Sequence, residues 1–168
     1  MAKTGKTVRA EVIVNAGLED VWEAWNTEEG VKIFLAPACR VELRPDGMYE
    51  VYFNPEAPPG ERGGEGNRVL AVQPMGMFSF TWNTPPTLPG VRDQRTHVVL
   101  RFLPECGPTR VTLCHDGWGT GGQWEQAFEY FQRAWGEVVL PRLQYRFESS
   151  PVDWDNPPDC EALAVGSE

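Results

Sequence analysis

The sequence contains few residues of the kinds that bind metals or form covalent crosslinks. It has two histidines and four cysteines in 168 residues, and no C-x-x-C pair occurs. The nearest grouping, formed by Cys106, Cys114 and His115, matches no recognised zinc spacing. We therefore expect free thiols, no metal site and no cofactor.

Basic charge and long apolar runs are also scarce. Lys and Arg total 15 against 24 Asp and Glu, which gives a net charge of −9. A nucleic-acid partner is disfavoured, because binding to phosphates needs clustered positive charge. Every apolar run is shorter than the ~20 residues of a membrane-spanning helix, and residues 1–14 lack the apolar stretch of a signal peptide. We expect no membrane insertion and a cytoplasmic location.

Two kinds of catalytic sequence motif are missing as well. No G-x-S-x-G elbow occurs, so Ser-His-Asp chemistry has no support. The glycine-rich stretches 60–66 and 117–122 lack the Lys of a phosphate-cradling loop. Nucleotide binding is therefore not expected.

Aromatic and apolar residues, in contrast, are abundant. They make up 41% of the chain and include 7 Trp, 8 Phe and 4 Tyr, which is too apolar a composition for a disordered protein. The length suits one domain, which we assign to residues 1–148. Residues 149–168 hold five acids, three prolines and no Lys or Arg. We expect an extended or disordered tail there; the alternative is a strap anchored by Trp154.

The spacing of apolar residues, either every second residue or every three to four residues, divides the domain into predicted strands and helices. The Asp46-Gly47 step predicts a tight hairpin turn, and the Pro- and Gly-rich residues 54–66 predict a loop. Helical spacing predicts two short helices, which begin near Leu18 and Thr27. Alternation of apolar and polar residues predicts seven strands, over residues 8–15, 39–44, 49–53, 68–73, 77–82, 96–102 and 110–115.

The longest helix is expected over residues 123–147. Trp124, Phe128 and Trp135 recur at helical spacing, and Pro141 should bend the helix or end its regular part. Such an aromatic helix must pack across the antiparallel sheet, which gives an α+β fold. Because an antiparallel sheet curls, we expect a cavity between the sheet and the helix.

Five segments of the chain follow one another in a recognisable order. They are AEVIVNAGLEDVWEAW (10–25), ELRPDGMYEVYF (42–53), VLAVQPMGMFSFTW (69–82), TRVTLCHDGW (109–118) and WEQAFEYFQRAWGEVVLPRL (124–143). Together they resemble the activator of heat-shock protein 90 ATPase homologue family, in the START-like or SRPBCC superfamily, over about residues 8–147. The resemblance implies a helix-grip fold with a deep hydrophobic cavity. The segment KIFLAPA (32–38) departs from the Trp-rich turn of that family, so a Trp-lined mouth is not implied.

The predicted strand and helix faces direct one set of side chains toward this cavity. These residues are either plain core or the lining of a pocket for a flat apolar ligand. The set comprises Tyr49, Val51, Phe53, Phe78, Phe80, Trp82, Val98, Leu100, Leu113, His115, Trp124, Phe128, Phe131 and Trp135.

Two members of the set are candidates for proton transfer. The ordinary pKa of histidine lies near 6.5, so His115 could act as a general base, and Tyr49 could donate or accept a proton. The alternative for His115 is a buried side chain that is paired with a backbone carbonyl. His97 is predicted to face outward.

Three functions remain open from the sequence. The leading hypothesis is binding of a small hydrophobic or aromatic molecule in the cavity. The second is a cyclase- or hydrolase-type enzyme that uses the same cavity, and the third is a chaperone-interacting module. The superfamily that the chain resembles includes lipid or polyketide binders, cyclase-like enzymes and chaperone partners, so it implies no single activity. A homodimer and a chaperone are the protein partners that we leave open.

Overall fold

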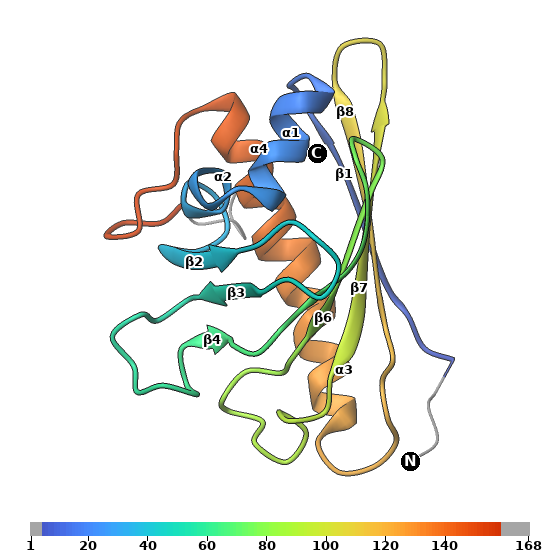
Figure 1. Cartoon of the computed structure of the whole chain (residues 1–168), viewed down its shortest axis with the longest axis vertical. Helices are drawn as coiled ribbons and strands as arrows, with labels where there is room; N and C mark the ends of the chain where they lie inside the picture. Colours follow the sequence, from blue (N-terminus) through green and yellow to red (C-terminus); the bar gives the residue numbers. More distant parts are fainter. Residues whose placement is uncertain (1–4, 159–168) are drawn as a thin grey trace.

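Two antiparallel β-sheets and a long C-terminal helix form the protein, shown in Figure 1 as a computed structural model that describes residues 5–158. The strands are β1 (Val8–Val14), β2 (Ala38–Val41), β3 (Tyr49–Tyr52), β4 (Gly63–Gly64), β5 (Val69–Gln73), β6 (Met77–Trp82), β7 (Thr96–Pro104) and β8 (Thr109–Asp116). The helices are α1 (Leu18–Asn26), α2 (Glu28–Lys32), α3 (Trp124–Arg133), η1 (Ala134–Val139) and α4 (Leu140–Glu148). The predicted α+β arrangement is confirmed.

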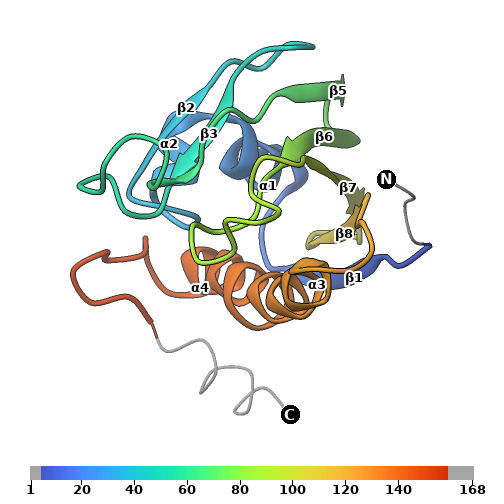
Figure 2. The same cartoon turned by 90° about the horizontal axis from the view of Figure 1, so that it is seen from below.

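The larger sheet has the strand order β1-β8-β7-β6-β5 and is antiparallel throughout. Its buried face follows the alternation in the sequence: in β1, Val8, Val12 and Val14 are buried, whereas Arg9 and Glu11 are exposed. Figure 2 shows this sheet curving from β1, beside the long helix, to β5 on the far side. Strand twist produces this curvature, and the sheet thereby wraps its apolar face around the helices.

The smaller sheet has the strand order β2-β3-β4. β4 consists of Gly63 and Gly64, which pair with Tyr52 and Val51, so it lies within the residues 54–66 that were predicted as a loop. The described residues therefore form eight strands, not seven. Two adjacent glycines have no side-chain alternation, so periodicity could not reveal this strand. At Gly63 the φ is +141° and a Cβ would lie 2.8 Å from the Val51 carbonyl oxygen, which only glycine tolerates.

The connection between β2 and β3 is longer than the predicted two-residue turn. β2 ends at Val41, and residues 42–48 link it to β3. Asp46 has a φ of 63°, and its N–H donates a hydrogen bond to the Val69 carbonyl oxygen at 2.8 Å. This bond ties the connection to β5 in the larger sheet.

The C-terminal helix runs without a break from Trp124 to Glu148. Its middle part, η1, is a π-helical turn, after which the Leu140 N–H donates to the Trp135 carbonyl oxygen, five residues earlier. Pro141 follows directly and has no N–H to donate. The irregularity predicted at Pro141 is thus a widened turn before the proline, and the helix continues beyond it.

The chain after α4 runs back beside α2, as Figure 1 shows. The Val152 N–H donates to the Ile33 carbonyl oxygen at 2.9 Å, and the Trp154 Nε1–H donates to the Lys32 carbonyl oxygen at 2.6 Å. The Val152 side chain is only 6% exposed. The rest of the acidic tail, including Cys160, lies outside the described residues.

Three cysteines, Cys39, Cys106 and Cys114, are free thiols. None of the helices within residues 5–158 combines the length and the apolar character needed to cross a membrane.

Candidate functional site

A groove of about 850 Å³ runs along one flank of the long helix. Its floor is aromatic and consists of Phe53, Trp82, Phe131 and Trp135. The groove opens to solvent along one side, where Phe53 and Tyr130 are each 45% exposed. Its helical wall includes Glu129, Tyr130, Arg133, Glu137, Val138 and Arg142. The volume falls within the ~300–1,000 Å³ of typical small-molecule sites.

A smaller recess of about 200 Å³ adjoins the groove and shares Phe53, Trp82, Tyr130 and Phe131 with it. The recess is lined in addition by polar side chains, among them Asn83 after β6 and Arg62 in the loop after β3. The groove therefore offers apolar contact, and the recess offers groups that can hydrogen-bond.

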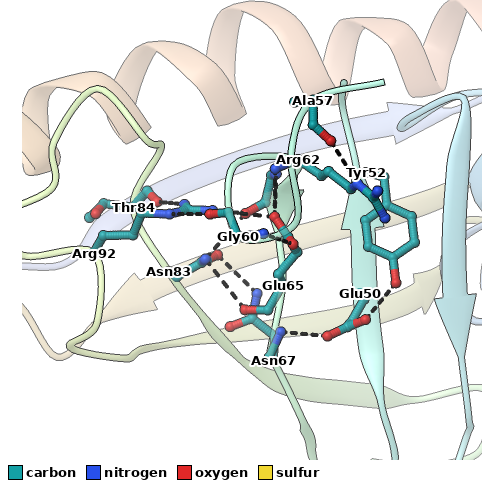
Figure 3. A network of polar contacts seen from close by, with 12 residues as sticks. Glu50, Tyr52, Ala57, Gly60, Arg62, Glu65, Asn67, Asn83, Thr84 and Arg92 are labelled. Atoms are coloured by element: carbon teal, nitrogen blue, oxygen red, sulfur yellow. Dashed lines mark hydrogen bonds and ion pairs between the residues drawn. The ribbon is translucent and has the colours of Figure 1, made fainter. Parts of the chain in front are cut away.

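The loop that walls the recess is held by a network of polar contacts, which Figure 3 shows from close by. The Glu65 carboxylate accepts hydrogen bonds from the backbone N–H groups of Gly60 and Arg62, both at 2.5 Å. The Arg92 guanidinium donates to the carbonyl oxygens of Gly60 at 2.7 Å and Gly63 at 2.9 Å. Hydrogen bonds to charged groups are roughly twice as strong as neutral ones, so this network stabilises the conformation of the loop.

The same network joins the loop to the segments that connect the strands of the larger sheet. Arg92 also donates to the Thr84 carbonyl oxygen, and the Asn67 amide donates to Asn83 Oδ1 at 3.0 Å. Arg95 donates to Asn67 Oδ1 at 3.0 Å. The wall of the recess is therefore anchored to the connection between β6 and β7 and to the residue pair before β5, and not only to its own sheet.

His115 is buried in the core, and both of its ring nitrogens are hydrogen-bonded. Trp135 Nε1–H donates to Nδ1 at 2.9 Å, so the ring proton of neutral His115 sits on Nε2 and is donated to Thr96 Oγ1 at 2.6 Å. The Thr96 hydroxyl donates in turn to the Trp82 carbonyl oxygen at 3.1 Å. Burial lowers the pKa of His115 to about 3, which keeps the ring neutral at pH 7. This chain of hydrogen bonds joins the long helix to β8, β7 and β6.

Tyr49 is also fully buried, and its hydroxyl donates to the Trp25 carbonyl oxygen at 2.8 Å. Burial raises the pKa of Tyr49 well above its ordinary value. Neither Tyr49 nor His115 borders the groove. The geometry therefore does not place either side chain where it could exchange a proton with a molecule bound there.

The cavity was predicted beneath the helix, between it and the sheet, whereas the groove lies along the helix flank. Four predicted lining residues, Phe53, Trp82, Phe131 and Trp135, border it. Ten others do not, because rings packed at centroid distances such as 4.5 Å between Tyr49 and Phe80 fill the space between sheet and helix. The ten are Tyr49, Val51, Phe78, Phe80, Val98, Leu100, Leu113, His115, Trp124 and Phe128.

The helical wall of the groove was not predicted from the sequence. Tyr130, Arg133 and Glu137 recur at helical spacing beside the apolar stripe, and Arg142 continues the same flank. Val138 belongs to the apolar stripe itself, but neither it nor these four residues were among the predicted lining residues. The sequence feature that could have predicted this wall is the presence of Tyr130 and Val138 among charged residues on one side of the helix.

No group of three or more His, Cys, Asp or Glu side chains that could hold a metal ion occurs in the part of the chain that the structure describes. The charged side chains along the groove are Glu129, Arg133, Glu137 and Arg142. With its aromatic floor, the groove can hold an apolar molecule and can also interact with charge on that molecule.

Both the sequence and the fold of this chain are similar to those of known proteins. Residues 15–148 match the family model described as Activator of Hsp90 ATPase homolog 1-like protein. No curated protein matches the sequence. Among solved structures, the Aha1 dimer from Colwellia psychrerythraea is similar with a TM-score of 0.66 and 15% identity, over 86% of this chain and 97% of that one.

Two further structures are similar in fold. The Bacillus halodurans protein BH1534 has a TM-score of 0.62 and 23% identity, over 88% of this chain and 100% of that one. DynU16, from the dynemicin biosynthetic locus, has a TM-score of 0.64 and 19% identity over 88% of this chain, which spans only about half (49%) of DynU16. The family match covers most of the sequence, and the fold agrees with it. This chain therefore belongs to the Activator of Hsp90 ATPase homolog 1-like family and has the helix-grip fold of the START-like superfamily.

Proposed function

We propose that the protein binds a small apolar or aromatic molecule in the groove along its C-terminal helix. The observation that carries this proposal is the aromatic floor of a groove of about 850 Å³, a size suited to a small molecule. Phe53 is the informative residue because it lies on the groove floor and is 45% exposed. A bound molecule would remove that ring from water, which is favourable by roughly 25 cal/mol per Å².

Titration with the neutral dye N-phenyl-1-naphthylamine, followed by its fluorescence, tests the proposal. The Phe53→Glu variant should bind the dye about tenfold more weakly, because roughly 60 Å² of apolar contact is lost. The matched control is Leu103→Glu on β7, since Leu103 is 50% exposed and does not line the groove. Failure of the wild-type protein to bind the dye, or equal binding by both variants, would contradict the proposal.

Enzymatic use of the same groove is less well supported. The two candidates for proton transfer, His115 and Tyr49, have their polar side-chain atoms engaged with Thr96, Trp135 and Trp25. An enzyme of cyclase or hydrolase type would have to use other side chains along the groove.

A contact with a chaperone is the second candidate function, and the family description supports it because it names activation of the Hsp90 ATPase. The relative from Colwellia psychrerythraea is described as a dimer, which supports the prediction of a homodimer. Addition of the purified protein to purified Hsp90, with the ATPase rate as the readout, tests the chaperone contact. A location in the cytoplasm stays a prediction from the sequence.

A further inference from the structure

Arg142 is a cation on the groove wall that has no acidic partner among the residues the structure describes. It lies on α4, lines the groove and is only partly exposed. None of the ion pairs or side-chain hydrogen bonds within residues 5–158 includes it, and its Nε is buried without a hydrogen-bond acceptor. A partly buried guanidinium without an acceptor is unfavourable, so an acceptor on a bound molecule that reaches its outer N–H groups would stabilise this arrangement.

Trp154 restricts where the Arg142 guanidinium can lie. The guanidinium carbon is 5.4 Å from the centre of the Trp154 ring, and Trp154 is itself fixed by its hydrogen bond to the Lys32 carbonyl oxygen at 2.6 Å. Stacking of a planar guanidinium on an indole is favourable and leaves its N–H edge available for acceptors. The segment after α4 therefore positions Arg142 at the groove.

The surroundings of Arg142 combine this cation with apolar surface. Val138 and Val139 lie one turn earlier on the same wall, and Trp135 lies on the floor. Glu137 also lines the groove but forms no ion pair with Arg142. An apolar body and an anionic oxygen group are the features of a ligand that would match this end of the groove.

We propose that Arg142 recognises an anionic oxygen group, such as a carboxylate, on the apolar or aromatic molecule that the groove binds, and that Trp154 is its positioning residue. This inference rests on the proposed function and adds the charge of the ligand to it. Charge-assisted hydrogen bonds to a guanidinium fork carry both strength and orientation, so an anionic molecule should bind more tightly than its neutral counterpart.

Two dyes that differ by one sulfonate test this inference. Wild-type protein should bind 1-anilinonaphthalene-8-sulfonate at least about tenfold more tightly than neutral N-phenyl-1-naphthylamine, because of the charge-assisted contact. The Arg142→Gln variant should lose this preference, because its neutral amide cannot form the charge-assisted contact with the sulfonate. Arg146→Gln is the matched control: Arg146 lies one turn later on α4 and also has a buried Nε without an acceptor, but it does not line the groove.

The outcomes separate this inference from the proposed function. If both dyes bind and Arg142→Gln changes neither affinity, or lowers both equally, the role of Arg142 is refuted and the groove stands. If neither dye binds the wild-type protein, both proposals fail. For Trp154, the Ala variant should reduce the preference for the sulfonate dye about threefold through loss of the stacking contact, and the Phe variant should restore it; an unchanged preference in Trp154→Ala would refute the positioning role.

Discussion

At the scale of single residues, His115 shows how a polar side chain can be fully satisfied inside an aromatic core. Its two ring nitrogens are paired with Trp135 and Thr96, and the Phe131 ring lies against it with centroids 4.8 Å apart. Because the indole N–H of Trp135 is a donor only, the tautomer of the imidazole is determined. His115 therefore sets the position of Trp135, which forms part of the groove floor.

The buried, neutral His115 predicts that the protein becomes less stable as the pH falls below 6.5. The unfolded chain takes up a proton near pH 6.5, whereas burial lowers the pKa in the folded protein to about 3, so protons favour the unfolded state between these values. This contribution to stability is complete above the unfolded pKa and is lost progressively toward pH 3. From pH 7.5 to pH 5.5, His115 alone should reduce the free energy of unfolding by about 1 kcal/mol.

Urea unfolding of the wild type and of His115→Gln at both pH values measures this effect. The variant should be less stable at pH 7.5, because the hydrogen bonds to Trp135 and Thr96 are disturbed, and should lose about 1 kcal/mol less on acidification. Identical pH dependence of the two proteins would show that His115 does not titrate on unfolding.

Residue by residue, the sequence predicted part of the groove. Alternation on β6 and helical spacing on α3 identified Trp82 and Phe131 as inward-facing, and both border the groove. The same patterns could not separate them from Phe80. The hydrophobic periodicity shows which face of a strand or helix is buried, but not whether a side chain on that face is covered completely by its neighbours. Arg142 was missed because its setting depends on Trp154, which comes from a different part of the chain.

At the scale of the elements, the long helix combines two regular helices with a wide turn between them. The alternation and helical periods predicted α3 and the strands of the larger sheet, since their buried faces are repeated in the sequence. They could not predict η1 or β4. The wide turn η1 is linked to the missing N–H of Pro141. The strand β4 depends on contacts between residues, such as those of Glu65 and Arg92 with Gly63.

Gly136 in η1 provides a test of the helix. A Cβ at this position would meet no atom within 4 Å, so Gly136→Ala fits the folded protein and reduces the conformational freedom of the unfolded chain. The free energy of unfolding in urea should rise by about 0.5–1 kcal/mol. Gly30→Ala in α2 is the contrasting variant, because its Cβ would lie 2.2 Å from the Glu23 carbonyl oxygen, and it should destabilise the protein. Destabilisation by Gly136→Ala would mean that η1 needs glycine.

At the scale of the whole molecule, three separate parts of the chain form the groove. The larger sheet contributes Trp82, the segment after β3 contributes Phe53, and the C-terminal helix contributes the remaining floor and one wall. The segment after α4 then fastens this helix to α2 through Val152 and Trp154. The shape of the groove thus depends on contacts between residues that are far apart in sequence.

Truncation after Ser149 tests the contribution of this last segment to the whole molecule. Removal of Val152 and Trp154 should lower the free energy of unfolding by about 2 kcal/mol, mainly through loss of the buried Val152 side chain and its apolar contacts. Val152→Asp in the full chain should have an effect of similar size. Equal stability of the truncated and full chains in urea would show that the segment is merely solvated.

The wide turn in the long helix has a consequence for comparing members of the family. In a regular α-helix, successive side chains are rotated by about 100° about the helix axis. A π-helical turn holds one extra residue, so every side chain after it points about 100° away from the direction it would have without that residue. Two residues beyond this turn have different surroundings: Leu143 packs in the core, and Arg142 lines the groove. A relative with a regular helix could keep both orientations only if its sequence were one residue shorter here. We expect alignments of the family to show a single-residue gap between Ala134 and Val139 in such relatives.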